Sequence, residues 1–192
     1  MNESGALPSP KPTLGQRIGA RWRNDLLFFV IAAAVITLDQ LTKAWVRDTL
    51  FVGQVWEHSF GPIRIVRLVN SGAAFGILQG QTPFLIVTSM LGLGAIVLYY
   101  VYPPMEHGIL RVALGMQLGG AIGNLIDRVR VGEVTDFIDV GRFPTFNVAD
   151  SSISVSIVAV LIFFLMQDMT HAKSPPGEDA PPTNGQTTLT DD

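Results

Sequence analysis

The chain has 192 residues, of which 48% are hydrophobic and only 15% are charged, and its formal net charge at pH 7 is −3. Soluble domains carry about 25% charged residues, so this composition favours an integral membrane protein, and the small net charge does not predict a nucleic-acid partner. The sequence contains no cysteine, which excludes disulfide bonds, a cysteine nucleophile and thiolate metal sites.

Two polar tails flank the apolar part of the chain. Residues 1–25 contain three closely spaced prolines and four basic side chains, which predicts a disordered tail that ends in a basic collar. Residues 172–192 contain four prolines and no apolar periodicity, which predicts a second disordered tail. The membrane domain is therefore expected over residues 26–171.

Four apolar stretches lie within this domain, at residues 26–45, 83–101, 109–126 and 151–167. About 20 helical residues cross the hydrocarbon core of a bilayer, so each stretch predicts one membrane-spanning helix. Four spans place both termini on one side of the membrane and the two long loops on the other. Basic residues are shared almost equally between the two sides, and the collar before the first span favours a cytoplasmic N-terminus.

The two long loops, residues 46–82 and 127–149, contain short β-branched runs broken by glycine and proline. The first loop predicts two or three short strands, including Ile63–Val69, and the second predicts a strand at Val134–Val140. The glycine-rich end of the first loop, Asn70–Gly76, suits a close approach of the backbone to another chain. The predicted fold is a four-helix membrane bundle with a small sheet outside the bilayer.

Three glycines in the third span, Gly115, Gly119 and Gly123, recur at every fourth position. Small residues at this spacing let two membrane helices approach closely. We therefore expect this face of the third helix to pack against another helix.

Polar side chains gather where the helices and strands meet the two loops. This set consists of Asp39, Lys43, Asn70, Asn124, Asp127, Arg128, Asn147 and Asp150. Because all of them fall on the loop side of the bundle, we expect them to converge at one membrane interface. Charged groups at such a place are costly and indicate a functional site.

Two charge pairs follow from helical spacing. Asp39 and Lys43 are four residues apart in the favourable order for an ion pair, either at the site or as an interfacial pair that reaches toward water. Asp127 and Arg128 are read as a structural pair that closes the mouth of the bundle, with a catalytic role for Asp127 as the second choice.

Asp136 and Asp150 are the carboxylates that we expect to carry chemistry. Two carboxylates that share a site cannot both ionise easily, so one can hold a proton while the other activates a water molecule. Asp150 begins a helix, whose dipole favours negative charge, so we assign the charge to Asp150 and the shared proton to Asp136. The alternative is that Asp150 only caps its helix and Asp136 only solvates a loop.

Five segments in order resemble the motif set of bacterial lipoprotein signal peptidases (signal peptidase II). They are LDQLTKAWV (Leu38–Val46), NSGAAFG (Asn70–Gly76), GGAIGNLIDRV (Gly119–Val129), VTDFID (Val134–Asp139) and FNVADSSI (Phe146–Ile153). The resemblance covers residues 26–167 and leaves out only the tails.

The resemblance implies a four-span aspartic peptidase of the bacterial inner membrane, with cytoplasmic termini, an extracytoplasmic sheet and no cofactor. Its substrates would be prolipoproteins with a diacylglyceryl-modified lipobox cysteine, and it would cut them just before that cysteine. Globomycin-type antibiotics would block the enzyme, and membrane lipids would surround it. The catalytic aspartates of the family match Asp136 and Asp150. Its supporting residues match Asp39, Lys43, Asn70, Gly72, Asn124, Asp127, Arg128, Asn147 and Ala149.

Other functions remain open at this point. An ion-coupled transporter would place its carboxylates near the middle of the bilayer, on broken helices, rather than at helix ends. A membrane scaffold would not need so many acids at one mouth. A serine–lysine peptidase would pair Lys43 with Ser71 or Ser152. The three histidines fall in separate regions, so we predict no metal site.

Overall fold

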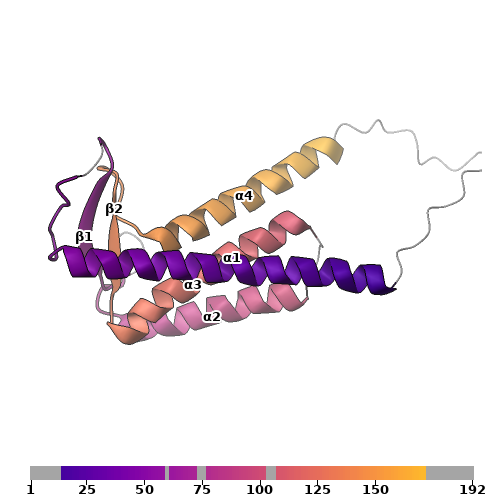
Figure 1. The fold of residues 1–192 in the computed structure, drawn as a ribbon, viewed down its shortest axis with the longest axis horizontal. Helices are drawn as coiled ribbons and strands as arrows, with labels where there is room; N and C mark the ends of the chain where they lie inside the picture. The colour runs from indigo at the N-terminus through magenta and orange to yellow at the C-terminus, as the bar shows by residue number, and fades with distance from the viewer. Residues whose placement is uncertain (1–13, 59–60, 73–76, 103–106, 172–192) are drawn as a thin grey trace, which may run out of the picture.

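A computed structural model describes residues 14–58, 61–72, 77–102 and 107–171 (Figure 1). The elements are α1 (Leu14–Thr49), β1 (Arg64–Asn70), α2 (Thr82–Val101), α3 (Gly108–Arg130), β2 (Val134–Asp139) and α4 (Val148–His171). In the described part of the chain, four helices are long and apolar enough to cross a membrane. The predicted fold of four membrane-spanning helices and a small sheet is confirmed.

Several boundaries differ from the sequence-based expectation. α1 begins at Leu14, so residues 14–25 are helical where a disordered tail was expected. α3 continues to Arg130, and α4 runs over 24 residues from Val148 to His171 instead of the short span 151–167. The sequence estimate stopped each span where the apolar residues stop, whereas a helix continues through polar residues until a backbone signal ends it.

The two strands form one antiparallel sheet in which Leu68 lies opposite Asp136 and Asn70 lies opposite Val134. Within its described residues, the first loop contributes this single strand and an isolated bridge between Val55 and Val66, rather than two or three strands. Of the glycine-rich segment Asn70–Gly76, residues 73–76 lie outside the described part of the chain. The pairing brings Asn70 and Asp136, which are 66 positions apart, to one end of the sheet.

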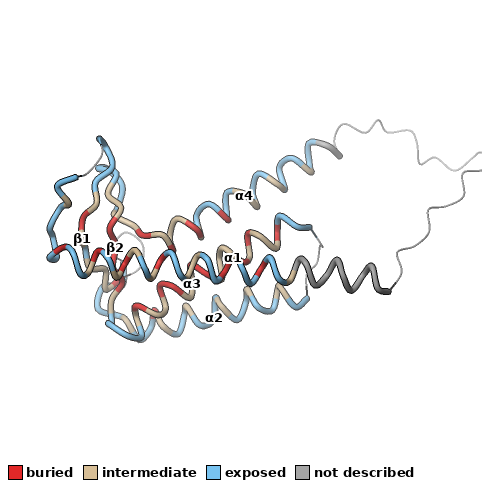
Figure 2. The backbone as a smooth tube through the Cα atoms, in the orientation of Figure 1, coloured by how far each residue is buried: buried red, intermediate tan, exposed pale blue. Residues whose placement is uncertain are grey.

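The sheet lies at one end of the bundle, where α1 and α3 end and α4 begins (Figure 1). Val46 in the last turn of α1 and Leu50, which directly follows the helix, pack with Phe137 of β2 in a small buried core. Figure 2 shows that buried residues gather at this end and along the inner side of α3. Burial of these apolar side chains fixes β2, and therefore Asp136, against the helices.

The glycine face of α3 packs against α1, as predicted. A Cβ atom at Gly115 would lie 2.8 Å from the carbonyl oxygen of Phe28, and one at Gly119 would lie 2.7 Å from that of Ala32. A Cβ atom at Gly123 would lie 2.5 Å from the carboxylate of Asp39. The close approach of the two helices therefore requires glycine at these positions.

We expect Gly119→Ala to destabilise the protein by about 1–3 kcal/mol, because the added methyl group would force α1 away from α3. Gly94→Ala in α2 is the matched control, since a Cβ atom there meets nothing within 4 Å and alanine favours the helix. Thermal unfolding in detergent measures both variants. Equal transition temperatures for the two would contradict this packing.

Candidate active site

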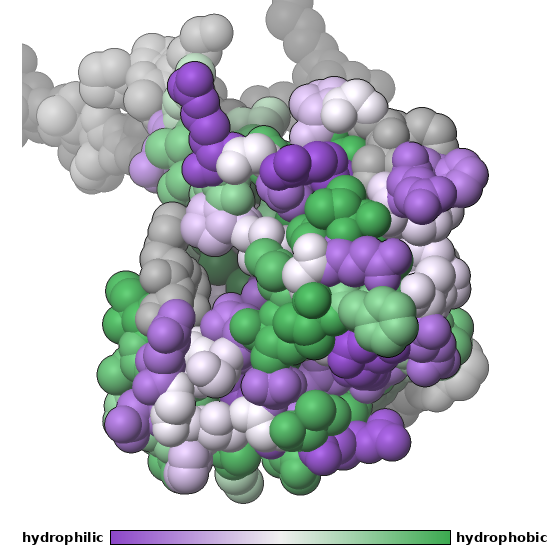
Figure 3. Space-filling view, turned by 90° about the vertical axis from the view of Figure 1, so that its left-hand side faces the viewer, coloured by the Kyte–Doolittle hydropathy of each residue, from purple (hydrophilic) through white to green (hydrophobic). Residues whose placement is uncertain are grey.

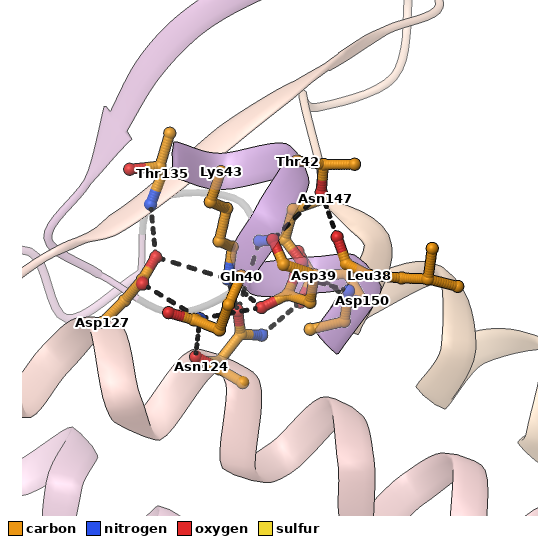
Figure 4. Close-up of polar contacts among 12 residues, drawn as sticks. Leu38, Asp39, Gln40, Thr42, Lys43, Asn124, Asp127, Thr135, Asn147 and Asp150 are labelled. Carbon is orange, nitrogen blue, oxygen red and sulfur yellow. Dashed lines mark hydrogen bonds and ion pairs between the residues drawn. The ribbon is translucent and has the colours of Figure 1, made fainter. Parts of the chain in front are cut away.

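Lys43 lies at the centre of a buried charge cluster (Figure 4). Its Nζ atom is 2.9 Å from Oδ2 of Asp39 and 3.3 Å from Oδ2 of Asp127, and it donates a 2.8 Å hydrogen bond to Oδ1 of Asn124. The side chains of Lys43 and Asp39 have no exposed surface, and that of Asp127 is 1% exposed. The predicted Asp39–Lys43 pair is confirmed, and the reading as an interfacial pair that reaches toward water is wrong.

The expected pair between Asp127 and Arg128 is also wrong. Asp127 accepts from Nη1 of Arg47 at 3.3 Å and from the backbone N–H of Thr135 at 3.2 Å, besides its contact with Lys43. Arg128 lies on a different side of α3, where its Nη2 atom donates to the carbonyl oxygen of Gly72 at 3.2 Å. Adjacent residues of a helix point in different directions, so they cannot form a side-by-side pair.

Asn147 precedes α4 and connects the two candidate aspartates. Its Oδ1 atom accepts from the backbone N–H of Asp150 at 3.0 Å, which is the usual bond of an N-cap residue. Its Nδ2 atom donates to Oδ1 of Asp136 at 2.6 Å. The cap of α4 therefore also holds the carboxylate on β2.

Two further asparagines have fixed orientations. Oδ1 of Asn70 accepts from the N–H of Gly72 at 2.9 Å, while its Nδ2 donates to Oδ2 of Asp136 at 2.9 Å. Oδ1 of Asn124 accepts from Lys43, while its Nδ2 donates to Oδ1 of Asp150 at 2.8 Å. In each amide the oxygen is taken by a donor, so the NH₂ group must face a carboxylate.

Asp136 and Asp150 line the same cavity of about 1090 Å³ at the sheet end of the bundle, together with Asn70, Asn124 and Arg128. Figure 3 shows this end of the molecule, where polar and apolar side chains mix around a hollow. Burial raises the pKa of Asp136 to about 6, and the negative field of Asp150 adds to the shift, against the hydrogen bonds from Asn70 and Asn147. The structure thus brings the two carboxylates to one place; their catalytic role stays a prediction.

The remaining supporting residues also lie in this network. Ala149 is fully buried, and its backbone N–H donates to Oδ1 of Asp39 at 3.0 Å, which ties the first turn of α4 to α1. Gly72 holds both Asn70 and Arg128 through its backbone. Hydrogen bonds and ion pairs that pass through Asp136 therefore link all the supporting residues expected from the sequence at one end of the bundle.

Three members of the network, Gln40, Arg47 and Thr135, were not predicted from the sequence. Gln40 donates to Asp39 at 3.2 Å, to the carbonyl oxygen of Gly123 at 3.1 Å and to Asp127 at 3.3 Å. Arg47 donates to the hydroxyl of Thr135 at 3.2 Å as well as to Asp127. Helical spacing was the available signal for Arg47, because it follows Lys43 by four residues on the same face of α1.

The geometry does not support a serine–lysine pair. Lys43 already makes three polar contacts, with Asp39, Asn124 and Asp127, and an ammonium group has only three hydrogens to donate. Ser152 donates to the carbonyl oxygens of Met116 and Ala149 at 3.2 and 2.8 Å. Within the described part of the chain, no hydrogen bond joins Lys43 to a serine.

Comparison with known proteins points to one family. The family model described as signal peptidase (SPase) II matches residues 31–166. A lipoprotein signal peptidase from Dehalococcoides mccartyi is 43% identical over 147 residues, which cover 74% of this chain and 91% of that protein. A lipoprotein signal peptidase from Shouchella clausii is 39% identical, with 76% and 97% covered.

The fold agrees with this assignment. A bacterial membrane enzyme whose structure was obtained by the in meso method at 2.3 Å resolution is 34% identical, with a TM-score of 0.71 and coverage of 79% of this chain and 94% of that one. A second such structure, at 1.9 Å resolution, is 35% identical with a TM-score of 0.66, over 72% and 92% of the two chains. The chain is therefore a multi-pass membrane protein that belongs to the signal peptidase II family of membrane peptidases.

Proposed function

We propose that this protein is an aspartic endopeptidase that removes signal peptides from diacylglyceryl-modified prolipoproteins, cutting before the lipidated cysteine. The observation that carries the proposal is that the carboxylates of Asp136 and Asp150 line one cavity, each held by asparagine amides of fixed orientation. The relatives named as lipoprotein signal peptidases support the substrate class.

In the proposed mechanism a water molecule lies between the two carboxyl groups. The Asp150 carboxylate takes a proton from this water while the water oxygen attacks the scissile carbonyl carbon. At the same time, protonated Asp136 gives its proton to the carbonyl oxygen. The C–N bond of the resulting tetrahedral intermediate then breaks. The leaving nitrogen takes the proton from Asp150, and one hydroxyl of the intermediate returns its proton to Asp136. The products are the carboxyl end of the signal peptide and the free amino group of the lipidated cysteine.

The surroundings of the two carboxyl groups support different protonation states. Asp150 lies in the first turn of α4, where the helix dipole favours negative charge, and Asn124 connects it to the ammonium group of Lys43. Asp136 lies in β2, outside the membrane-spanning helices, and its raised pKa favours the protonated form. We therefore keep the assignment of the shared proton to Asp136.

The placement of the cavity suits a lipid-bearing substrate. The cavity lies where the helices meet the sheet, so acyl chains can stay in the bilayer while the peptide reaches water. We propose the bacterial inner membrane as the location, with both termini cytoplasmic and the cavity on the extracytoplasmic face. A globomycin-type inhibitor would bind in the same cavity and displace the substrate.

Cleavage of a purified precursor tests the function. The protein in detergent is expected to cut a diacylglyceryl-modified prolipoprotein and to leave the same precursor without the lipid intact. Mass spectrometry should find the lipidated cysteine as the first residue of the product. A transporter or a scaffold would not cleave the precursor, so absence of cleavage by the unaltered protein would contradict the proposal.

The activity is expected to fall as pH rises through the pKa of Asp136. The proton on Asp136 is required, and its pKa is raised from 3.8 to about 6, so the active form is lost on the alkaline side. The pH dependence of kcat/KM reports the free enzyme and should show this decline near pH 6. A decline centred near pH 4, the value of an ordinary aspartate, would contradict the assignment of the shared proton.

A further inference from the structure

One face of α3 lies between α2 and α4, and Asn124 near its end also binds α1, through Lys43. Leu110, Leu114, Gln117, Asn124 and Arg128 follow one another at intervals of four, three, seven and four residues, which places them on one side of the helix. The glycines that contact α1 lie on the opposite side of α3. We call the face from Leu110 to Arg128 the groove face.

Leu114, Gln117 and Arg128 of the groove face stay partly exposed between the neighbouring helices, whereas Leu110 and Asn124 are buried. α2 and α4 both pack on α3, and no extended contact joins α2 to α4 in the described part of the chain. Figure 1 shows α4 diverging from α2 with α3 between them. From Leu110 to Arg128 the groove face follows about 27 Å of helix.

A cavity lies at each end of the groove face. Asn124 and Arg128 line the large cavity that contains Asp136 and Asp150. Leu114 and Gln117 line a second cavity of about 370 Å³, whose other walls include Tyr99 of α2 and Phe164 of α4. The same side of α3 therefore leads from the two carboxylates into the membrane part of the bundle.

Gln117 has no partner for its amide among the residues that the structure describes. It makes no hydrogen bond or ion pair there, and it faces a cavity with mostly apolar walls. It lies nine residues from the start of α3 and 13 from its end, in the middle part of a helix that is long and apolar enough to cross a membrane. A polar amide at this depth requires a hydrogen-bond partner, and such amides commonly bond across membrane helices.

We propose that the groove face binds the apolar segment of the signal peptide as a helix, with the amide NH₂ of Gln117 donating a hydrogen bond to a backbone carbonyl oxygen of that helix. This inference rests on the proposed function. The part of the substrate on the amino side of the cut must lead from Asp136 and Asp150 back into the bilayer, and Asn124 and Arg128 at one end of the groove face line the cavity of these two carboxylates. Signal peptides carry 7–15 apolar residues, roughly 10–22 Å of helix, which fit the groove.

Disulfide crosslinking tests this placement, because the protein has no cysteine of its own. Single changes Gln117→Cys and Val160→Cys would be combined with Asp150→Asn, which keeps the precursor uncut. The precursor would carry one free cysteine in its apolar segment. Its lipidated cysteine cannot form a disulfide bond, because the sulfur is already bound to the diacylglyceryl group as a thioether. Ile162→Cys is the matched control, since Ile162 is 50% exposed and lies on the opposite side of α4 from Val160.

We expect crosslinks to the precursor from positions 117 and 160 and none from position 162. Equal crosslinking at all three positions would overturn the proposal, and so would crosslinks between two copies of the Gln117→Cys protein in place of the precursor. If only Ser154→Cys in the large cavity formed a crosslink to the precursor, lipid would occupy the groove face. This result would overturn the placement of the signal peptide and leave the proposed function intact. Failure of the unaltered protein to cut the lipidated precursor would overturn both.

A kinetic variant gives an independent readout. Gln117→Leu is expected to raise KM for the full precursor about three- to tenfold and to leave kcat unchanged, because one membrane hydrogen bond to the bound segment is lost. A lipidated substrate that lacks the apolar segment should show no change in KM. An equal effect on both substrates would indicate a structural role for Gln117 and contradict the proposed contact.

Discussion

Asp136→Asn and Asp150→Asn are each expected to lower the kcat of prolipoprotein cleavage by about 10³-fold or more. Each asparagine keeps the shape of the side chain but can neither accept the proton of the water nor hold the shared proton. The two variants should lose activity to a similar extent, because groups that act as one unit show strongly non-additive effects. Cleavage of a lipidated precursor by the purified variants measures this.

Asp139→Asn is the matched control for this experiment. Asp139 lies on β2, three residues beyond Asp136, but it does not line the large cavity and instead binds Arg64 and the N–H of Gly141. Its loss should change activity by no more than about twofold, as for an ordinary surface substitution. If Asp136→Asn or Asp150→Asn kept one tenth of the normal activity while folded, the carboxylate mechanism would fail.

Lys43→Met is expected to destabilise the protein by about 3–5 kcal/mol. The change leaves the buried carboxylate of Asp39 without a cationic partner, while Asp127 keeps only its 3.3 Å contact with Arg47, and an unpaired buried charge carries a penalty of this size. Arg64→Met, which breaks an ion pair whose arginine is 51% exposed, should cost about 0–1 kcal/mol. Unfolding transitions in detergent compare the two.

A second substitution distinguishes charge from packing. Asp39→Asn added to Lys43→Met removes the uncompensated charge of Asp39, so we expect the double variant to recover part of the lost stability. If the double variant were less stable than Lys43→Met, the loss would come from packing around the lysine stem, and the electrostatic account of the cluster would be wrong.

The sequence allowed the helices and their closest contacts to be predicted because these depend on local patterns. Apolar stretches of about 20 residues identified the spans, and the four-residue spacing of Gly115, Gly119 and Gly123 identified the face that packs on another helix. The Asp39–Lys43 pair lies within one helix and also followed from spacing. These features need no knowledge of which elements meet.

The parts that the sequence did not predict depend on contacts between distant elements. The partners of Asp127 come from α1 and β2, so its position next to Arg128 gave a wrong pair. The double role of Asn147, as cap of α4 and donor to Asp136, arises only because β2 lies beside that helix end. The end of α3 at Arg130 was misplaced because Asp127 and Arg128, which continue the helix, have their partners in other parts of the chain.

An experimental structure with a bound inhibitor tests the central claim most directly. The inhibitor would be a lipopeptide in which a hydroxyl-bearing carbon replaces the scissile carbonyl and stands in for the tetrahedral intermediate. The account predicts that this hydroxyl lies within hydrogen-bond distance of a carboxyl oxygen of both Asp136 and Asp150. A hydroxyl bound to a serine or to Lys43, with either carboxyl group turned away, would contradict it.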